Sequence, residues 1–300
     1  MNLTGLHILL TYTCNYECDH CFVWGSPRQT GVFTWARLED VYRQAVELGT
    51  VMEIYFEGGE AFLYYPLLLK AVGRAHELGF RTGIVSNAYW ATTPEDAGLW
   101  IEPLAEAGLD ELDVSSDVYH GDDAQEQRAQ NAVNAATARG IETAQFRLSP
   151  PITTRGADPS LRGAPVTGGD IMFRGRAAET LVPGLPGQPW EFFDACPYED
   201  LVNPARLHLD PFGNLHLCQG LVAGNLFVRP LKDIVAGYHA HNHPVAADLL
   251  AGGPAELVRR YEIAHADTYA DACHLCYSVR KALRLRFPEI LTPDQMYGVA

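Results

Sequence analysis

Three cysteines lie within eight residues near the start of this 300-residue chain, in the stretch CNYECDHC. Cys14, Cys18 and Cys21 follow the apolar run HILLTYT, so they are predicted to lie on the loop after a strand. Three thiolates from one loop can hold three corners of a [4Fe-4S] cluster and leave the fourth iron without a protein ligand. A zinc site completed by His20 or by a distant residue is the alternative.

The four remaining cysteines lie in the last third of the chain. Cys196 precedes a predicted hairpin, Cys218 ends it, and Cys273 and Cys276 form a C-x2-C pair at the start of the last predicted helix. Four thiolates saturate an iron-sulfur cluster, which then suits electron transfer rather than substrate binding. A structural zinc ribbon with the same four ligands is the alternative.

Polar residues also gather where several predicted strands end. They are Gly58, Gly59 and Glu60 in FEGGEAF, Ser86 and Asn87, Ser115, Ser116 and Asp117, and Arg147. The carboxyl ends of parallel strands meet at one rim, which is where βα barrels build active sites. Glycine at such a place lets a ligand approach the backbone closely. For Ser115 and Asp117, capping of the following helix is the alternative.

The elements that must position these residues alternate along the first half of the chain. Strands are predicted at 7–13, 52–58, 81–87, 111–116 and 143–148, and helices at 35–49, 66–79, 93–108 and 123–140. Residues 149–169 are rich in proline and glycine, and a sixth strand is expected near 170–177. This rhythm predicts an α/β fold with a partial (β/α)6 TIM barrel over residues 1–185.

The pattern changes beyond residue 185. The stretch ARLHLDPFGNLHLC, residues 205–218, predicts two strands joined by a turn at 211–214, and short helices follow. We therefore expect a small α+β unit over residues 186–300 that carries the second set of cysteines.

The composition narrows the classes of function. With a formal net charge of -15, the surface repels phosphate backbones and acidic membranes, so neither nucleic acid nor a membrane is an expected partner. The sequence shows no apolar run of about 20 residues and no signal peptide. An odd number of cysteines, seven, argues against a disulfide framework. A cytoplasmic protein with metal or redox chemistry is expected.

The C-x3-C-x2-C loop, followed by GGE at the end of the next predicted strand, resembles the radical S-adenosylmethionine (radical SAM) enzymes. The resemblance implies a [4Fe-4S] cluster on Cys14, Cys18 and Cys21, with S-adenosylmethionine (SAM) bound at the open iron. It also implies further SAM-binding residues: the backbone of Gly58, Gly59 and Glu60 at the methionyl amino group, Ser86, Asn87, Ser115 and Arg147 at the ribose and carboxylate, and His20 against the adenine. A solvent-facing loop histidine is the alternative for His20.

The C-terminal order of one cysteine, a hairpin and a late C-x2-C pair resembles the twitch domain, the shortened relative of the SPASM domain, in an architecture like that of 2-deoxy-scyllo-inosamine dehydrogenase. The resemblance implies one auxiliary [4Fe-4S] cluster on Cys196, Cys218, Cys273 and Cys276. Such a cluster can accept an electron after hydrogen abstraction, which favours dehydrogenation or oxidative bond formation. A base near the substrate is then needed. Asp117, Tyr119 and His120 are candidates, although residues on a rim also serve as caps and turns.

These patterns predict a radical SAM oxidoreductase that acts on a small polar metabolite and takes electrons from a donor such as flavodoxin or ferredoxin. The first predicted strand begins near the first residue, which favours a small substrate over a peptide held by an N-terminal leader-binding module. A peptide-modifying maturase that uses a separate leader-binding protein is the second hypothesis. A non-catalytic iron-sulfur or zinc-binding protein is the third.

Overall fold

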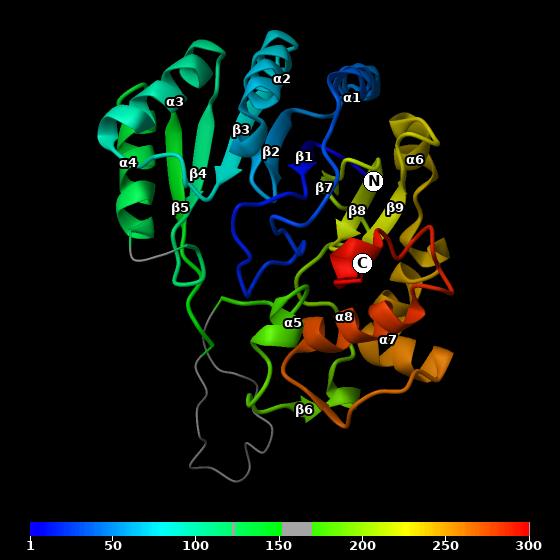
Figure 1. Cartoon of the computed structure of the whole chain (residues 1–300). Coiled ribbons are helices and arrows are strands. Elements are labelled where there is room, and N and C mark those ends of the chain that lie inside the picture. Colours follow the sequence, from blue (N-terminus) through cyan, green and yellow to red (C-terminus); the bar gives the residue numbers. More distant parts are fainter. Residues whose placement is uncertain (122–123, 152–169, 300) are drawn as a thin grey trace.

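The computed structural model describes residues 1–121, 124–151 and 170–299, and an eight-stranded sheet runs through them (Figure 1). The strand order is β5-β4-β3-β2-β1-β7-β8-β9. The bounds are β1 Gly5–Thr11, β2 Glu53–Gly58, β3 Arg81–Ser86, β4 Glu111–Ser115, β5 Glu142–Phe146, β7 Arg206–Leu209, β8 Asn214–Cys218 and β9 Leu221–Asn225. The five strands predicted before residue 150 are all present. The fold is α/β, as expected.

Six strands of this sheet, from β5 to β7 in the spatial order, are parallel to their neighbours, and β8 and β9 are antiparallel. Among the described residues, the edge strands β5 and β9 do not pair with each other, so the sheet is not a closed barrel. The carboxyl ends of the parallel strands therefore form an open rim.

Four helices follow the first four strands and cover one face of the sheet (Figure 1). They are α1 Trp35–Leu48, α2 Tyr65–Glu77, α3 Pro94–Glu106 and α4 Gln125–Thr137. The Thr34 and Thr93 side chains cap α1 and α3 by accepting backbone N–H bonds. Because side chains alternate along a strand, Leu6 and Ile8 of β1 are fully buried, whereas His7 between them lines a cavity.

The remaining elements are short: α5, α7 and α8 lie together below the sheet, and α6 lies beside β9 (Figure 1). They are α5 Ala177–Thr180, α6 Leu231–Gly237, α7 Ala246–Tyr261 and α8 Ala272–Leu283, with β6 Gln188–Pro189 paired to β10 Thr268–Tyr269 and the 3-10 turns η1 Ala61–Tyr64, η3 Trp190–Phe192, η4 Ala240–Asn242 and η5 Asp294–Tyr297. None of the helices in the described part of the chain has both the length and the apolar character needed to cross a membrane.

The sixth strand expected near residues 170–177 was wrongly placed, because that segment forms a turn and the start of α5. Its apolar and basic residues alternate as in a strand, but the Arg174 and Arg176 side chains are used in long-range hydrogen bonds instead. The sixth parallel strand is β7, the first arm of the predicted hairpin, which pairs with β1. The domain boundary near residue 185 stays a prediction, and the sheet continues beyond it.

Candidate functional site

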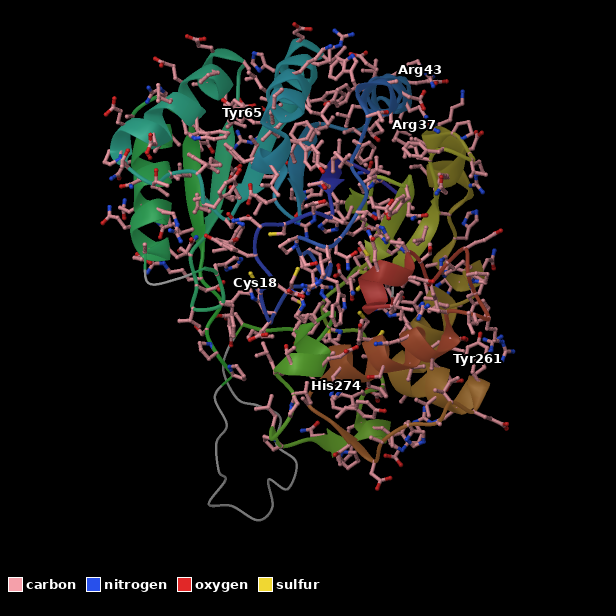
Figure 2. All side chains as sticks on the ribbon, in the orientation of Figure 1. Cys18, Arg37, Arg43, Tyr65, Tyr261 and His274 are labelled. Carbon is pink, nitrogen blue, oxygen red and sulfur yellow. The ribbon has the colours of Figure 1, made fainter. Side chains whose placement is uncertain are left out.

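A cavity of about 520 Å³ lies along the polar face of the sheet and reaches the carboxyl ends of its parallel strands. Most of the residues predicted for the site line it: Cys14, Cys18, His20, Cys21, Gly58, Gly59, Glu60, Ser86, Asn87, Ser115, Asp117 and His120. Figure 2 shows Cys18 between the sheet and the short helices at its open end. The structure therefore brings together residues that come from the ends of four strands.

The three thiols of the first loop lie in surroundings that call for a cation. Backbone N–H groups of Tyr16 and Gly25 donate to the sulfurs of Cys14 and Cys21, at 3.4 and 3.2 Å. Burial raises the pKa of Cys14 to about 12, with a further rise from the Glu60 carboxylate, and burial also raises the pKa of Cys18. These raised pKa values favour the protonated thiols. A coordinated metal reverses this preference, because it stabilises the thiolate directly.

The spacing of the sulfurs distinguishes a cluster from a single ion. Among the described residues, only two groups of three metal-ligating atoms lie within 4.8 Å of one another, and neither includes a cysteine. A zinc tetrahedron with bonds of about 2.3 Å would bring its sulfurs to roughly 3.8 Å. An iron-sulfur cluster spreads them farther, because several irons lie between the sulfurs. No three cysteine sulfurs in the described part of the chain lie that close together, which agrees with a cluster.

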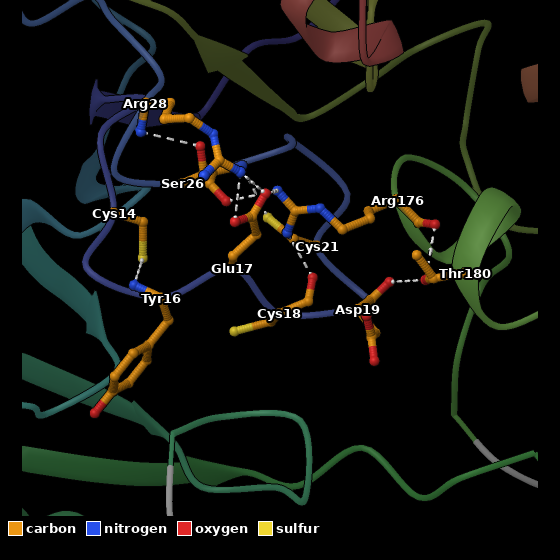
Figure 3. Close-up of polar contacts among 11 residues, drawn as sticks. Cys14, Tyr16, Glu17, Cys18, Asp19, Cys21, Ser26, Arg28, Arg176 and Thr180 are labelled. Atoms are coloured by element: carbon orange, nitrogen blue, oxygen red, sulfur yellow. Dashed lines mark hydrogen bonds and ion pairs between the residues drawn. The ribbon is translucent and has the colours of Figure 1, made fainter.

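Arg176, just before α5, holds the cysteine loop in place (Figure 3). Its guanidinium is buried and donates to the carbonyl oxygens of Cys18 and Gly25, at 2.7 and 2.8 Å. The Thr180 hydroxyl donates to the carbonyl of Asp19 at 2.8 Å. These residues were not predicted from the sequence. No local pattern could have identified them, because each contact spans more than 150 residues.

The GGE segment shows why glycine is required there. Gly58 has a φ of 142°, and a Cβ on Gly59 would lie 2.2 Å from the carbonyl oxygen of Thr13. The Gly59 N–H donates to the Thr11 carbonyl at 2.7 Å, so the end of β2 is held against the start of the cysteine loop. The glycines make room for this backbone crossing.

Glu60 is a buried carboxylate that joins the ends of β2 and β3. Its oxygens accept hydrogen bonds from the Ser86 hydroxyl at 2.9 Å and from the Asn87 N–H at 2.8 Å. Burial raises the pKa of Glu60 to about 7 despite these bonds. The Ser86 hydroxyl, predicted to contact SAM, also accepts from the Ala88 N–H and the Trp90 indole, so its bonds lie within the protein. The Asn87 amide donates to Asn15 Oδ1 at 2.9 Å.

The candidate bases lie close to His20. The rings of Tyr119 and His120 lie 5.0 and 4.8 Å from the His20 ring, and His120 Nδ1 lies 2.8 Å from the Asp117 carboxylate. Burial lowers the pKa of His20 to about 4, and the nearby His120 lowers it further, so its neutral form is favoured. Tyr119 is not among the residues that line the cavity.

Arg147 lies away from the cavity. Its side chain is exposed and pairs with Glu126, and its guanidinium donates to the amide oxygen of Gln145 at 2.8 Å. Phe146 and Leu148, its neighbours in sequence, line the cavity instead, as the alternation of side chains along an extended chain requires. The structure therefore does not bring Arg147 to the other predicted SAM-binding residues.

A comparison with known families bears on this geometry. The family described as "Radical SAM superfamily" matches residues 8–146, from the first strand through β5, and includes the cysteine loop and the GGE segment. Residues 8–146 form a radical SAM domain. The family implies a [4Fe-4S] cluster and SAM, and the thiol spacing and the N–H bonds to sulfur described above fit such a cluster.

Two curated proteins resemble the radical SAM domain of this chain. The "Putative peptide biosynthesis protein YydG" of Bacillus subtilis (strain 168) is 26% identical over 113 residues, and the "Probable GTP 3',8-cyclase" of Methanothermobacter marburgensis is 33% identical over 116 residues. Each match covers 38% of this chain and 35% of the relative. The chain thus aligns with about a third of each relative.

A solved structure extends the likeness beyond the radical SAM domain. The crystal structure of BtrN in complex with AdoMet and 2-DOIA superposes with a TM-score of 0.52 and 17% sequence identity, and the match covers 78% of this chain and 82% of BtrN. At this level of identity the likeness concerns the fold alone.

The second set of cysteines lies outside the radical SAM domain and meets at a small cavity between β8, α8 and the loop at Cys196. Two arginines, Arg174 and the buried Arg280, line it as well. Arg174 Nη1 donates to Cys218 Sγ at 3.3 Å, and Arg280, 1% exposed, has a buried Nε without a partner among the described residues. Burial raises the pKa of Cys276 to about 11. Guanidinium groups beside four thiols suit a ligand that carries negative charge when bound.

Proposed function

We propose that this chain is a radical SAM oxidoreductase that removes hydrogen from a small polar metabolite and completes a two-electron oxidation. The observation that carries the proposal is one cavity that is lined at one end by the cysteine loop and at the other by polar side chains of the sheet. A volume of about 520 Å³ lies within the range of small-molecule sites, and SAM itself must fit there as well. The part of the cavity that SAM leaves free favours a small substrate.

The residues of the radical SAM domain have separate tasks in this proposal. Cys14, Cys18 and Cys21 would hold the cluster, which together with SAM supplies a 5'-deoxyadenosyl radical when both are bound. The backbone of Gly58, Gly59 and Glu60 lies beside the loop, where the methionyl group of SAM would bind. The protein's own share is to position the substrate and to exclude water from the cavity.

The second half of the reaction requires a proton acceptor and an electron acceptor. Asp117 and His120 form a hydrogen-bonded pair at the cavity wall. Burial alone would raise the pKa of Asp117, but the hydrogen bond and charge of His120 outweigh it and lower that pKa, so the carboxylate is ionised. We assign the electron acceptor to an auxiliary cluster on Cys196, Cys218, Cys273 and Cys276, supported by the Arg174 and Arg280 side chains at the same cavity. An external donor such as flavodoxin or ferredoxin would supply the first electron.

Iron content and SAM cleavage test this proposal. Anaerobically reconstituted protein should contain about eight irons per chain and release 5'-deoxyadenosine when dithionite and SAM are added. The triple variant Cys14→Ala/Cys18→Ala/Cys21→Ala should retain about four irons and release none. A wild-type chain with four irons and one zinc would contradict the role of the second cysteine set. A fully loaded chain that never cleaves SAM, with or without candidate metabolites, would contradict the enzymatic proposal.

Peptide modification is the second candidate, because one relative of the radical SAM domain is named for peptide biosynthesis. The two candidate functions differ in the substrate that must be present for the chain to consume SAM. A metabolite oxidase should form 5'-deoxyadenosine in step with a small oxidised product, one for one. A maturase should require a peptide together with a leader-binding protein.

A further inference from the structure

The polar face of the sheet carries a second group of ligand atoms, which begins next to the GGE segment and contains no cysteine. His7 on β1, Glu57 on β2 and His208 on β7 come from three adjacent strands and line the cavity. His7 Nδ1 and His208 Nε2 lie 2.7 and 3.2 Å from the same carboxylate oxygen, Glu57 Oε1. One ligand atom from each of the three residues lies within 4.8 Å of the other two. This is the spacing of a single ion, in contrast to both sets of cysteines.

We propose that His7, Glu57 and His208 bind a divalent metal ion inside the cavity. Two imidazoles and one carboxylate on one side of an ion form a facial set that leaves its other coordination positions open. This donor set suits Zn²⁺, Fe²⁺, Mn²⁺ or Co²⁺. The open positions would face the cavity, where an oxygen or nitrogen of the substrate can bind. Only the binding of substrate at these open positions rests on the proposed function.

The three side chains are held by their neighbours before any ion arrives. The ring of Tyr55 stacks on His7 with the planes 4° apart and the centroids separated by 4.8 Å, and the Phe22 ring packs edge-on against His208. The His7 and Glu57 side chains are only 12% and 13% exposed. Ligands whose rotamers are fixed by packing lose little conformational freedom when a metal binds.

The charge of the cavity also favours a cation. Among the described residues that line it, five are acidic and two are arginines. Asp113 on β4 is one of the acidic residues, is 6% exposed, and has a buried Oδ1 with no hydrogen-bond partner in the part of the chain that the structure describes. An unpartnered carboxylate oxygen is costly in a buried place. A metal-bound water or a bound ligand would supply the missing donor.

The sequence contains signals for this group. His7 lies between Leu6 and Ile8, and His208 lies between Leu207 and Leu209. A histidine at an alternate position of an apolar strand points to the face opposite its neighbours. The pairing of β1 with β7 then places His7 directly opposite His208. That pairing could not be read from the sequence, because two hundred residues separate the strands.

Metal titration of the reconstituted full-length chain, without SAM or substrate, tests the proposal. The probe is Mn²⁺, whose free form is counted by its six-line EPR signal, because the oxidised [4Fe-4S] cluster is EPR-silent. We expect one Mn²⁺ per chain, displaced by one equivalent of Zn²⁺. Electron spin-echo modulation from imidazole nitrogen should appear in the bound spectrum. Glu57→Gln and His208→Gln should each weaken binding at least about tenfold, since loss of a supporting group alone costs 10–100-fold.

The controls separate this site from surface binding and from misfolding. The variant His239→Gln/His241→Gln alters two exposed histidines and should bind Mn²⁺ as the wild type does. Circular dichroism and iron content check that each variant folds, and His7→Gln provides a third independent variant. Wild-type chain that binds no stoichiometric ion, binding that survives in Glu57→Gln and His208→Gln, or a bound spectrum without nitrogen modulation would each overturn the proposal. A chain that binds Mn²⁺ but never cleaves SAM contradicts the proposed function and leaves the metal site standing.

Discussion

At the scale of single residues, the cysteine loop depends on a charge that comes from a distant part of the chain. Arg176 is 4% exposed, and its guanidinium lies among backbone carbonyls of the loop, 3.9 Å from the Glu17 carboxylate. Burying a guanidinium is costly unless its donors are used. The loop supplies the acceptors, and Arg176 in turn fixes the backbone on which Cys18 lies.

Replacement of Arg176 by glutamine should therefore destabilise the loop. Loss of hydrogen bonds from a buried charged group costs about 1.5–3 kcal/mol, and the iron content should fall as the three thiols lose their common geometry. Urea unfolding followed by tryptophan fluorescence, with iron analysis, measures both effects.

Arg28→Gln is a matched control, because Arg28 pairs with Glu17 in the same loop but is 77% exposed. An exposed ion pair contributes about 0–1 kcal/mol. Equal losses in the two variants would contradict a special role for Arg176.

Both sets of cysteines were predicted from residue type and spacing, and the structure brings each set to the wall of one cavity. The residues that support these sets could not be predicted in the same way. Arg174, Arg176 and Arg280 act across long sequence separations, and a lone arginine has no local signature. Arg147 shows the opposite case. Its residue type and its place at the end of a strand suggested SAM binding, but its exposed side chain pairs with Glu126.

At the scale of elements, the end of β2 is the tightest place in the radical SAM domain. Gly59→Ala would press a methyl group against the Thr13 carbonyl, 2.2 Å away, and the backbone of β2 or of the cysteine loop would have to move. Overpacking of this kind costs about 1–3 kcal/mol or more. We expect lower stability and incomplete cluster assembly, measured by urea unfolding and iron content.

Gly98→Ala in α3 is the control for this substitution. A Cβ there meets only the Arg139 guanidinium, at 3.7 Å, and alanine favours a helix over glycine by about 0.5–1 kcal/mol. Gly98→Ala should therefore raise stability. A stable, fully loaded Gly59→Ala chain would show that the crossing tolerates a side chain.

A buried histidine at the start of α7 should make the stability of the folded chain depend on pH. His243, 8% exposed, accepts the N–H groups of Val245 and Ala246 at Nδ1 and donates from Nε2 to the Val222 carbonyl at 3.0 Å. Burial lowers the pKa of His243, so the folded chain binds fewer protons there than the unfolded chain. The stability from this group is present above the unfolded pKa of about 6.5 and is lost as the pH falls toward the lower folded pKa.

Urea unfolding at pH 7.5 and pH 5.5 measures this contribution. His243→Gln should be less stable than the wild type at pH 7.5 and should lose less stability on acidification. His241→Gln, at an exposed position in the same turn, should leave the pH dependence unchanged. An identical fall in wild type and His243→Gln would refute the assignment.

The same scale shows how far the sequence determines the elements. The five strands and four helices before residue 150 were predicted within a few residues, because their apolar periodicity agrees with their glycine and threonine boundaries. The sixth strand was misplaced because the alternation in IMFRGRA comes from arginines that serve the two cysteine sets. Because these two side chains form long-range hydrogen bonds, their alternation does not mark the polar face of a strand.

At the scale of the whole molecule, β1 connects the part of the sheet formed by β2 to β5 with the part formed by β7 to β9. It lies between β2 and β7, and its buried Leu6 and Ile8 pair in register with the buried Leu207 and Leu209 (Figure 1). A fragment of residues 1–185 would expose this edge of β1 and its apolar side chains. We expect the fragment to bind the dye ANS and to unfold without a cooperative transition, whereas the full chain unfolds cooperatively. Cooperative unfolding of the fragment would support an independent unit that ends near residue 185.

The position of β1 in the sheet also determines how late in translation the fold can be completed. The ribosome releases the cysteine loop early, but β7 emerges only after about 200 further residues, or roughly 10–40 s at 5–20 residues per second. Arg176, which fixes the loop backbone, also follows long after the cysteines. We therefore expect iron and sulfide to be taken up only after most of the chain has been synthesised, and the three thiols to be open to oxidation until then.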